Sequence, residues 1–232
     1  MRNISPQLEV IVLNSKDAIK AQEYNVDRLE LLRDLDKGGL TPSFEIIKNV
    51  TNAVDIPVYV MLRNLWDSYV YDIEEFKIIL QELEMIKLTK AKGIIFGSLN
   101  SDGTINEEQL KTIIAEKGTL ELTFHRAIDS TVDYQQGIKT LSQFNEIDYV
   151  STSGHAEKAM DGMFNLSWAS RILKEKIMVG SGVTPANCNE FLQIQNIKKL
   201  HAGTAVRINR NIFNELDKEA IYKMKEALDS KL

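Results

Sequence analysis

Short apolar runs alternate with longer amphipathic segments along the whole chain. In several of the short runs every second residue is apolar, which is the period of a strand. In the longer segments apolar residues recur every three or four positions, which is the period of a helix. Eight runs of the first kind are each followed by a segment of the second kind. This order is typical of βα units around a parallel sheet.

The pattern assigns eight strands, eight helices and two long loops. Strands are predicted over residues 8–13, 28–32, 58–62, 93–96, 120–124, 149–152, 177–179 and 199–201. Helices are predicted over residues 15–24, 43–50, 73–90, 107–117, 134–144, 166–174, 185–193 and 219–228, with surface loops over 97–106 and 207–216. Eight units in roughly the 250 residues typical of the architecture favour an α/β TIM (β/α)8 barrel over an open doubly wound sheet. No linker or low-complexity run interrupts them, so we predict a single domain over residues 1–232.

Polar residues mark where three of these helices begin. Asp72 is placed to cap the helix over 73–90. Ser43 is placed to cap the helix that follows the Gly38–Gly39 turn. Pro185, directly after Thr184, suits the first position of the helix over 185–193.

Composition and charge limit the partners of the chain. The 232 residues include 44% hydrophobic and 26% charged residues and carry a formal net charge of −5. This balance leaves no basic stripe for nucleic acid or an anionic membrane surface. No window approaches the roughly 20 apolar residues of a membrane span, and the N-terminal apolar run is too short for a signal peptide, so we expect a cytoplasmic protein. The single cysteine, Cys188, excludes an internal disulfide and a Cys–Cys metal motif.

The segment LELTFHRAID brings three titratable residues to one strand end. Alternation places Thr123 and His125 on the face opposite Leu122 and Phe124, and Arg126 and Asp129 follow directly. An exposed antiparallel strand would alternate in the same way. The eightfold repeat favours the barrel, in which this polar face points into the lumen and the active site lies at the C-terminal strand ends.

Strands one to three add further charges to the lumen. Arg28 and Glu30 share one face of strand two, and Arg63 follows strand three on the same face as Met61. Strand one can add Glu9 to this set of charges. Such charges can pair with one another as a purely structural feature. They can equally form a site in which carboxylates move protons and arginines hold an anion. The second interpretation gives these candidates: catalytic Glu30, His125 and Asp129; anion-binding Arg28, Arg63 and Arg126.

The last two strand exits are rich in small residues. In many barrels the loops after strands seven and eight bind a phosphate through backbone N–H groups. Small residues are also common in the turns that follow a strand, without any role in binding. The candidate anion-binding residues here are Gly180, Ser181, Gly182, Gly203 and Thr204.

All three histidines follow predicted strands. His125 closes strand five, His155 follows strand six and His201 ends strand eight. Because all three histidines are predicted to lie at the C-terminal end of the barrel, we favour a functional role for His125 and His201. The role of His155 stays undecided. Cys188 is predicted to be structural. Five methionines are predicted to fill the core: Met61, Met85, Met160, Met163 and Met178.

The order of motifs RLELL, GGLTPS, VMLR, FGSL, TFHRAID, TSG and GSGV resembles the CutC copper homeostasis family along nearly the whole chain. The resemblance implies a cytoplasmic TIM barrel that associates as a homodimer and is linked to copper tolerance or trafficking. The family-like positions are Arg28, Glu30, Arg63, His125, Arg126, Asp129 and His201.

Two departures from the family pattern bear on copper. Leu32 stands where the family commonly has a cysteine, and residues 64–67 read Asn-Leu-Trp-Asp instead of Pro-Arg followed by glycines. Soft Cu(I) favours sulfur ligands, whereas imidazole and carboxylate suit Cu(II) or Zn(II). A bound copper ion would therefore need His125 and His201 together with a carboxylate, unless methionines contribute.

Two functions remain open. One is a copper-binding homeostasis protein, and the other is a lyase, isomerase or hydrolase that acts on a small anionic or phosphorylated metabolite through His125, Glu30 and the arginines. Schiff-base chemistry needs a lysine inside the barrel. Lys176 and Lys199 lie at the wrong ends of their strands, which argues against it. A scaffold would not need a charged lumen.

Overall fold

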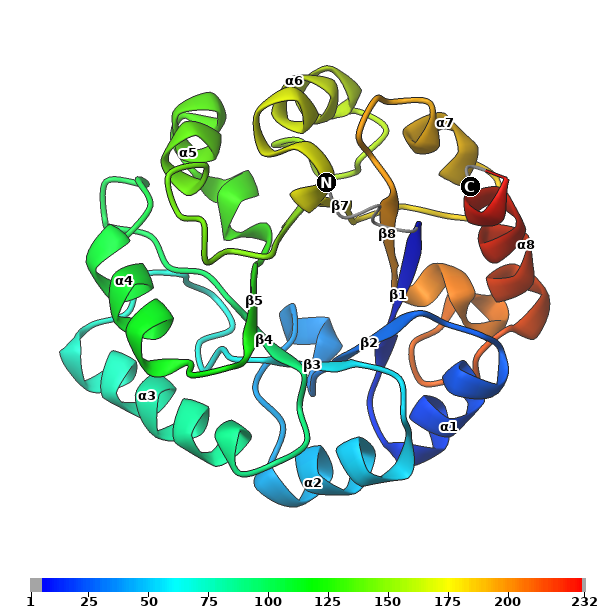
Figure 1. The fold of residues 1–232 in the computed structure, drawn as a ribbon, viewed down its shortest axis with the longest axis horizontal. Helices are drawn as coiled ribbons and strands as arrows, with labels where there is room; N and C mark the ends of the chain where they lie inside the picture. Colours follow the sequence, from blue (N-terminus) through cyan, green and yellow to red (C-terminus); the bar gives the residue numbers. More distant parts are fainter. Residues whose placement is uncertain (1–5, 231–232) are drawn as a thin grey trace.

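Eight parallel strands close into a barrel in the order of the chain. The computed structural model describes residues 6–230, and Figure 1 looks down the barrel with the helices in a ring outside the strands. The strands are β1 (Gln7–Val12), β2 (Arg28–Leu31), β3 (Val58–Met61), β4 (Gly93–Phe96), β5 (Glu121–Phe124), β6 (Tyr149–Thr152), β7 (Ile177–Val179) and β8 (Lys199–Ala202).

A helix follows every strand. The α-helices are α1 (Ser15–Glu23), α2 (Phe44–Ala53), α3 (Ile73–Lys87), α4 (Glu107–Glu116), α5 (Tyr134–Leu141), α6 (Met163–Leu173), α7 (Cys188–Leu192) and α8 (Lys218–Asp229). Short 3-10 helices lie in the loops: η1 (Leu35–Lys37), η2 (Arg126–Ser130), η3 (Lys174–Lys176), η4 (Thr204–Val206) and η5 (Ile208–Arg210).

Alternation along each strand separates two apolar regions. Outward residues such as Leu8, Val10 and Leu29 are fully buried between the strands and the helices, in the main core. Inward residues of the strands, joined by Ile212 from the segment after η5, form a smaller apolar cluster composed of Ile11, Leu32, Tyr59, Met61, Ile95 and Ile212. The polar inward residues are therefore set among apolar neighbours, which strengthens every electrostatic interaction between them.

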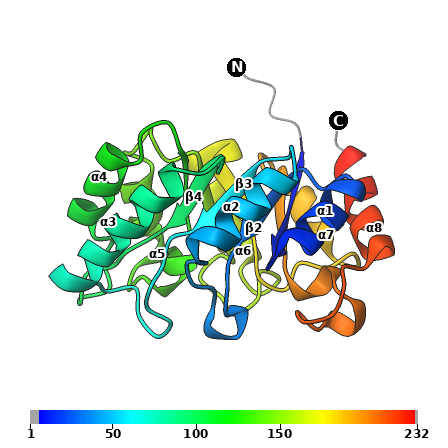
Figure 2. The same ribbon diagram turned by 90° about the horizontal axis from the view of Figure 1, so that it is seen from below.

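Strand register brings charged residues of distant segments together. Glu9 on β1 is aligned with Arg28 on β2 and with His201 on β8. Seen from the side in Figure 2, the segments that follow β2 and β8 project from the same lower end of the barrel. This end holds the C-terminal ends of the strands and, as shown below, the cavity.

The sequence predicted the strands more accurately than the helices. Each predicted strand end lies within one residue of the observed end. The predicted caps are confirmed, because Asp72 accepts from Glu75 N–H at 2.8 Å and Ser43 accepts from Ile46 N–H.

Several helix ends were predicted wrongly. Helix α7 begins at Cys188 and not at Pro185, since the Asn187 side chain accepts from Thr184 N–H at 2.8 Å and turns the chain before the helix. Helix α6 begins at Met163, before the predicted position, behind Gly162, which supplies no side-chain cap. The predicted loop 207–216 contains η5. None of the helices between residues 6 and 230 is long and apolar enough to cross a bilayer.

Candidate active site

A cavity of about 740 Å³ opens at the C-terminal ends of the strands. Strand residues Glu9, Glu30 and His201 form its floor, and loop residues such as Lys158 and Arg210 reach its mouth. This is the end at which TIM barrels carry their active sites.

The floor of the cavity is a cluster of two carboxylates and one imidazole, here called the Glu9–Glu30–His201 cluster. His201 Nδ1 lies 2.8 Å from Glu9 Oε1 and 3.1 Å from Glu30 Oε2. Both glutamates are buried, and Glu9 is only 1% exposed. A single imidazole proton is therefore shared between two carboxylates inside the barrel.

The two carboxylates of this cluster differ in their environment. Arg28 Nε donates to Glu9 Oε2 at 2.6 Å. Burial alone would raise the pKa of Glu9, but the Arg28 charge, together with His201, holds it below its usual value. Burial raises the pKa of Glu30 to about 7, and the neighbouring Glu9 charge adds to the shift, against the opposing effect of His201. Two adjacent glutamates thus take different protonation states.

His201 responds to the same neighbours in the opposite direction. Burial disfavours its charged form, yet the nearby Glu30 and Glu9 carboxylates outweigh burial and raise the pKa of His201. Glu30, whose pKa is about 7, therefore lies beside an imidazole whose pKa is raised, and a carboxyl with a pKa near 7 can transfer a proton at physiological pH.

Arg28 lies beneath the cavity and does not line it. Its guanidinium carbon is 3.3 Å from the centre of the Tyr59 ring and 4.3 Å from that of Tyr149. Arg28 Nη2 donates to Thr123 Oγ1 at 3.2 Å. The predicted contact of Arg28 with a bound anion does not match this placement, because aromatic rings and Glu9 enclose the guanidinium.

The mouth of the cavity is cationic. Four basic side chains line it: Arg63, Arg126, Lys158 and Arg210. Arg63 Nη1 and Nη2 donate to the backbone carbonyl oxygens of Gly38, Gly39 and Trp66. Because these acceptors carry no net charge, they do not neutralise the positive charge of the guanidinium. The sequence predicted Arg63 and Arg126 but missed Lys158 and Arg210, since both lie in loops where no alternation indicates which way a side chain points.

His125 lies on the cavity wall, next to Arg63 and Tyr69. Its ring centre is 5.0 Å from that of Tyr69, and its Nδ1 accepts from Ala127 N–H at 3.2 Å. Burial, with the Arg63 charge, lowers the pKa of His125 to about 3. The imidazole is therefore neutral, and it does not act as the near-neutral titrating group that the sequence suggested.

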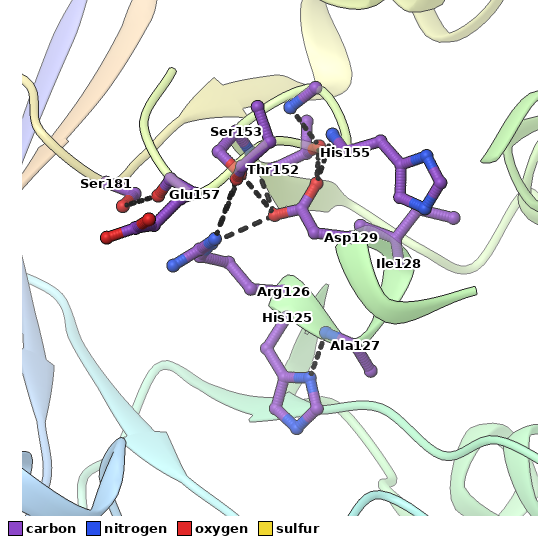
Figure 3. A network of polar contacts seen from close by, with 12 residues as sticks. His125, Arg126, Ala127, Ile128, Asp129, Thr152, Ser153, His155, Glu157 and Ser181 are labelled. Atoms are coloured by element: carbon purple, nitrogen blue, oxygen red, sulfur yellow. Dashed lines mark hydrogen bonds and ion pairs between the residues drawn. The ribbon is translucent and has the colours of Figure 1, made fainter. Parts of the chain in front are cut away.

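Asp129 is the centre of a separate hydrogen-bond network (Figure 3). Its carboxylate accepts from Thr152 Oγ1 at 2.6 Å, from Ser153 N–H and Oγ at 2.9 Å, and from His155 N–H at 3.0 Å. Arg126 Nε also donates to the Asp129 carboxylate, at 2.9 Å. Asp129 joins η2 to the end of β6, and it is not among the residues that line the cavity.

The glycine-rich exits contribute unequally to the cavity. Of the residues predicted to bind an anion there, Ser181, Gly182, Gly203 and Thr204 line the cavity, whereas Gly180 does not. Gly180 instead lies beside His201, where a Cβ atom would make ordinary van der Waals contact with His201 Cδ2 at 3.4 Å.

The pattern of the CutC family matches residues 6–206. This chain belongs to the CutC family. A Histophilus somni CutC family protein is 33% identical over a region that covers 84% of this chain and 80% of that protein. The copper homeostasis protein cutC homolog of Homo sapiens is 32% identical over 84% of this chain and 71% of that protein. The crystal structure of CutC from Streptococcus agalactiae has a TM-score of 0.79 and 25% identity, and the match covers 85% of this chain and 98% of that one.

Within this CutC barrel the predicted metal ligands separate. Glu9, Glu30 and His201 place one potential ligand atom each within 4.8 Å of one another, and His125 does not belong to this group. Leu32 lines the cavity and offers no ligand atom. Cys188 is buried at the start of α7. The donors gathered at one point are thus nitrogen and oxygen.

The remaining predicted residues lie as follows. His155 is an exposed residue and does not line the cavity. Its ring stacks on that of Tyr134, with 5.6 Å between the ring centres. Met61 and Met160 line the cavity, and Met178 is fully buried. Met85 is 40% exposed on α3, so its prediction as a core residue was wrong, since the outer face of that helix carries it.

Proposed function

We propose that the cavity is the active site of an enzyme that moves a proton on a small anionic metabolite. The observation that carries this proposal is the Glu30–His201 pair on the cavity floor, 3.1 Å apart. A buried carboxyl with a pKa near 7 exists in both protonation states at physiological pH. It is therefore suited to take up a proton and to return it.

The charges around the cavity support an anionic substrate. Arg63, Arg126, Lys158 and Arg210 lie around the mouth, and the Glu9 charge on the floor is offset by Arg28. Loop backbone at Gly182 and Gly203 allows a charged group to approach closely. The substrate would then place its anionic end at the mouth and its reacting carbon near the floor.

Each member of the floor has a distinct role in this proposal. The ionised Glu30 carboxylate accepts a proton from the substrate, and His201 stabilises whichever form of Glu30 is present by sharing its Nδ1 proton. Arg28 acts as a positioning residue, since it keeps Glu9 ionised and directs the added proton to Glu30. The proton is afterwards returned from Glu30 to the same or a neighbouring atom.

Hydrogen exchange in D2O tests the proposal whatever the product of the reaction is. The protein is incubated with aldose and ketose phosphates, and loss of C–H signals is followed by NMR. We expect exchange with at least one compound and its loss in Glu30→Gln, with Glu108→Gln, a change at an exposed helix residue, as the control. If Glu30→Gln exchanges at the same rate as the wild type, or no compound exchanges, the proposal is contradicted.

The Glu9–Glu30–His201 cluster favours a second candidate function, the binding of divalent copper. Carboxylate and imidazole donors within 4.8 Å of one another suit Cu(II) or Zn(II). They do not suit Cu(I), for which the cavity offers only thioether sulfur, from Met61 and Met160. This candidate connects the geometry with the copper homeostasis named for the relatives.

An anaerobic competition titration separates the two oxidation states. The metal-free protein is titrated with Cu(I) and with Cu(II), and the variants His201→Ala and His125→Ala are compared. The cluster predicts stoichiometric Cu(II) binding that weakens in His201→Ala and persists in His125→Ala. Binding that depends on His125 alone would place copper elsewhere. The homodimer and the cytoplasmic location implied by the family stay predictions.

A further inference from the structure

The segments that leave β7 and β8 carry backbone N–H groups without an acceptor. Among residues 6–230, no group accepts a hydrogen bond from the backbone N–H of Ser181, Gly182, Gly203, Thr204 or Ala205. All five residues line the cavity, and each is at least partly exposed. Because glycine has no side chain, the exposed surface of Gly182 and Gly203 is that of their backbone. These five N–H groups are here called the amide cluster.

The barrel brings the two halves of the amide cluster together. Parallel register pairs the last residue of β7 with Leu200 on β8. The pairing continues beyond the end of β7, since a Cβ atom at Gly180 would lie 3.4 Å from His201 Cδ2. Gly182 and Gly203 each follow two positions later, on segments that leave neighbouring strands about 4.8 Å apart. The two loops therefore reach the cavity side by side.

The loop after β7 is fixed through groups other than these N–H groups. Ser181 O accepts from Ala159 N–H at 3.0 Å, and Ser181 Oγ donates to the Glu157 carbonyl oxygen at 2.6 Å (Figure 3). Gly182 O accepts from Asn187 Nδ2 at 2.9 Å. The carbonyl oxygens of Ser181 and Gly182 are thus used within the protein, whereas their N–H groups are left for a ligand.

The loop after β6 holds Lys158 beside the amide cluster. The Lys158 stem lies across Gly182, because a Cβ atom at Gly182 would be 3.3 Å from both Cβ and Cγ of Lys158. The same loop is closed at its base by Gly162, where a Cβ atom would overlap the Ser153 carbonyl oxygen. Direct backbone packing at one end and the bonds to Ser181 at the other therefore position the Lys158 side chain.

The Lys158 ammonium has no carboxylate of the cavity beside it. Among the described residues that line the cavity, the carboxylates are Glu9 and Glu30, and both contact His201 on the floor. The neighbouring Glu157 is exposed and does not line the cavity. A cation next to several free backbone N–H groups favours an anion with several acceptor oxygens.

We propose that the amide cluster and Lys158 bind a phosphate group of the substrate. This inference rests on the proposed acid–base function and deepens it, since it makes the substrate a small phosphate monoester. A phosphate monoester offers three acceptor oxygens and a charge of about −1.5 to −2 at pH 7, more than a carboxylate offers. Donors from two loops together with an ammonium group match these oxygens and this charge.

The same placement limits the length of the substrate. Gly203 follows His201 by two residues, a rise of roughly 7 Å along a strand. A phosphate at the amide cluster therefore leaves room for a short carbon chain between it and the Glu30–His201 pair on the floor. The reacting carbon would lie a few bonds from the phosphate oxygen.

A titration with inorganic phosphate reads the amide cluster directly. Protein labelled with ¹⁵N is followed by ¹H–¹⁵N NMR as phosphate is added, and acetate is added to a second sample at matched ionic strength. We expect phosphate to move the amide signals of Gly182, Gly203 and Thr204 further than acetate does. Gly103 and Gly137, which line a different hollow, serve as internal controls. Signals of the amide cluster that phosphate leaves in place, or moves no further than acetate, would overturn the proposal.

A charge-matched pair of variants tests Lys158. Lys158→Gln removes the ammonium beside the amide cluster, and Lys223→Gln removes an exposed ammonium on α8. We expect phosphate affinity to fall about tenfold in Lys158→Gln and to be unchanged in Lys223→Gln. Equal affinity in the two variants would show that Lys158 does not contact the phosphate.

Two variants at position 204 test the backbone donor. Thr204→Pro removes an N–H group that has no acceptor among residues 6–230, and proline suits the first position of a helix such as η4. Thr204→Ala keeps that N–H group. We expect phosphate to bind about tenfold more weakly to Thr204→Pro than to Thr204→Ala. Equal binding would exclude the Thr204 N–H from the site.

The two proposals fail in different ways. If phosphate moves the amide cluster but no compound undergoes Glu30-dependent exchange, the phosphate site stands and the acid–base function fails. If exchange occurs but inorganic phosphate does not compete with it and Lys158→Gln does not weaken it, the acid–base function stands and the phosphate site fails.

Discussion

His125 and Asp129 lie four residues apart on one strand exit, yet their polar atoms are satisfied in opposite ways. The Asp129 carboxylate accepts hydrogen bonds from η2 and from the loop after β6, as Figure 3 shows. The His125 ring lies apart from that network in the same view, with one nitrogen bonded to Ala127 and the other unpaired among the described residues.

This difference separates a polar residue with all its hydrogen bonds made from one with a hydrogen bond left unmade. Asp129 has no hydrogen-bonding capacity left for a ligand and no place on the cavity wall. His125 has a donor, a rigid ring and a place on the wall.

The largest expected effect is the loss of the Asp129 network. Asp129→Ala removes the acceptor of the Ser153 and His155 backbone N–H groups and of Arg126 Nε, so we expect the free energy of unfolding to fall by about 3 kcal/mol or more. Urea denaturation measures it. Asp102→Ala removes an exposed loop carboxylate and is the control. A variant of unchanged stability that has lost proton exchange would restore the catalytic role predicted for Asp129.

A pH-dependent effect is expected at Glu30. Its pKa in the folded protein, about 7, exceeds the ordinary value of 4.5, so the folded state binds an extra proton. The contribution of Glu30 to wild-type stability is therefore fully present below pH 4.5 and is lost as the pH rises through 7. Glu30→Gln should gain about 2 kcal/mol relative to wild type between pH 5 and pH 8.

The same urea experiment at two pH values measures this gain. Glu108→Gln, at a side chain that is 88% exposed, serves as the control and should show no such trend. An equal stability difference between Glu30→Gln and wild type at pH 5 and at pH 8 would mean that the Glu30 pKa is not raised.

The smallest expected effect is at His125. His125→Asn keeps the bond to Ala127 and removes a donor that had no partner, so stability should change by about 1 kcal/mol or less. Parallel urea curves for His125→Asn and Asp129→Ala sharpen the comparison. A loss at His125 as large as that at Asp129 would indicate that the ring is also a structural element.

Strand alternation was enough to predict which residues enter the lumen. It placed Arg28, Glu30 and Thr123 inward, and the register then brought Glu9 and His201 together. Alternation does not indicate how deep in the barrel an inward side chain lies. It therefore did not reveal that Arg28 lies between two tyrosine rings below the cavity.

The rest of the site depends on contacts between distant segments. Asp129 is satisfied by residues 152–155, more than 20 positions away, and nothing in its own motif indicates them. Lys158 and Arg210 reach the mouth from irregular loops. The Gly97 contact that holds His125 likewise arises from strand packing and not from a local pattern.

A titration of the glutamate side chains tests the central claim most directly. Protein labelled with ¹³C at the glutamate carboxyl carbon is followed by NMR from pH 4 to pH 9, with Glu9→Gln and Glu30→Gln used to assign the two signals. The account predicts that Glu9 titrates below the ordinary glutamate value while Glu30 gains its proton near pH 7. If Glu30 instead titrates at the ordinary glutamate value, the cavity floor holds no acid–base pair and the proposed function is contradicted.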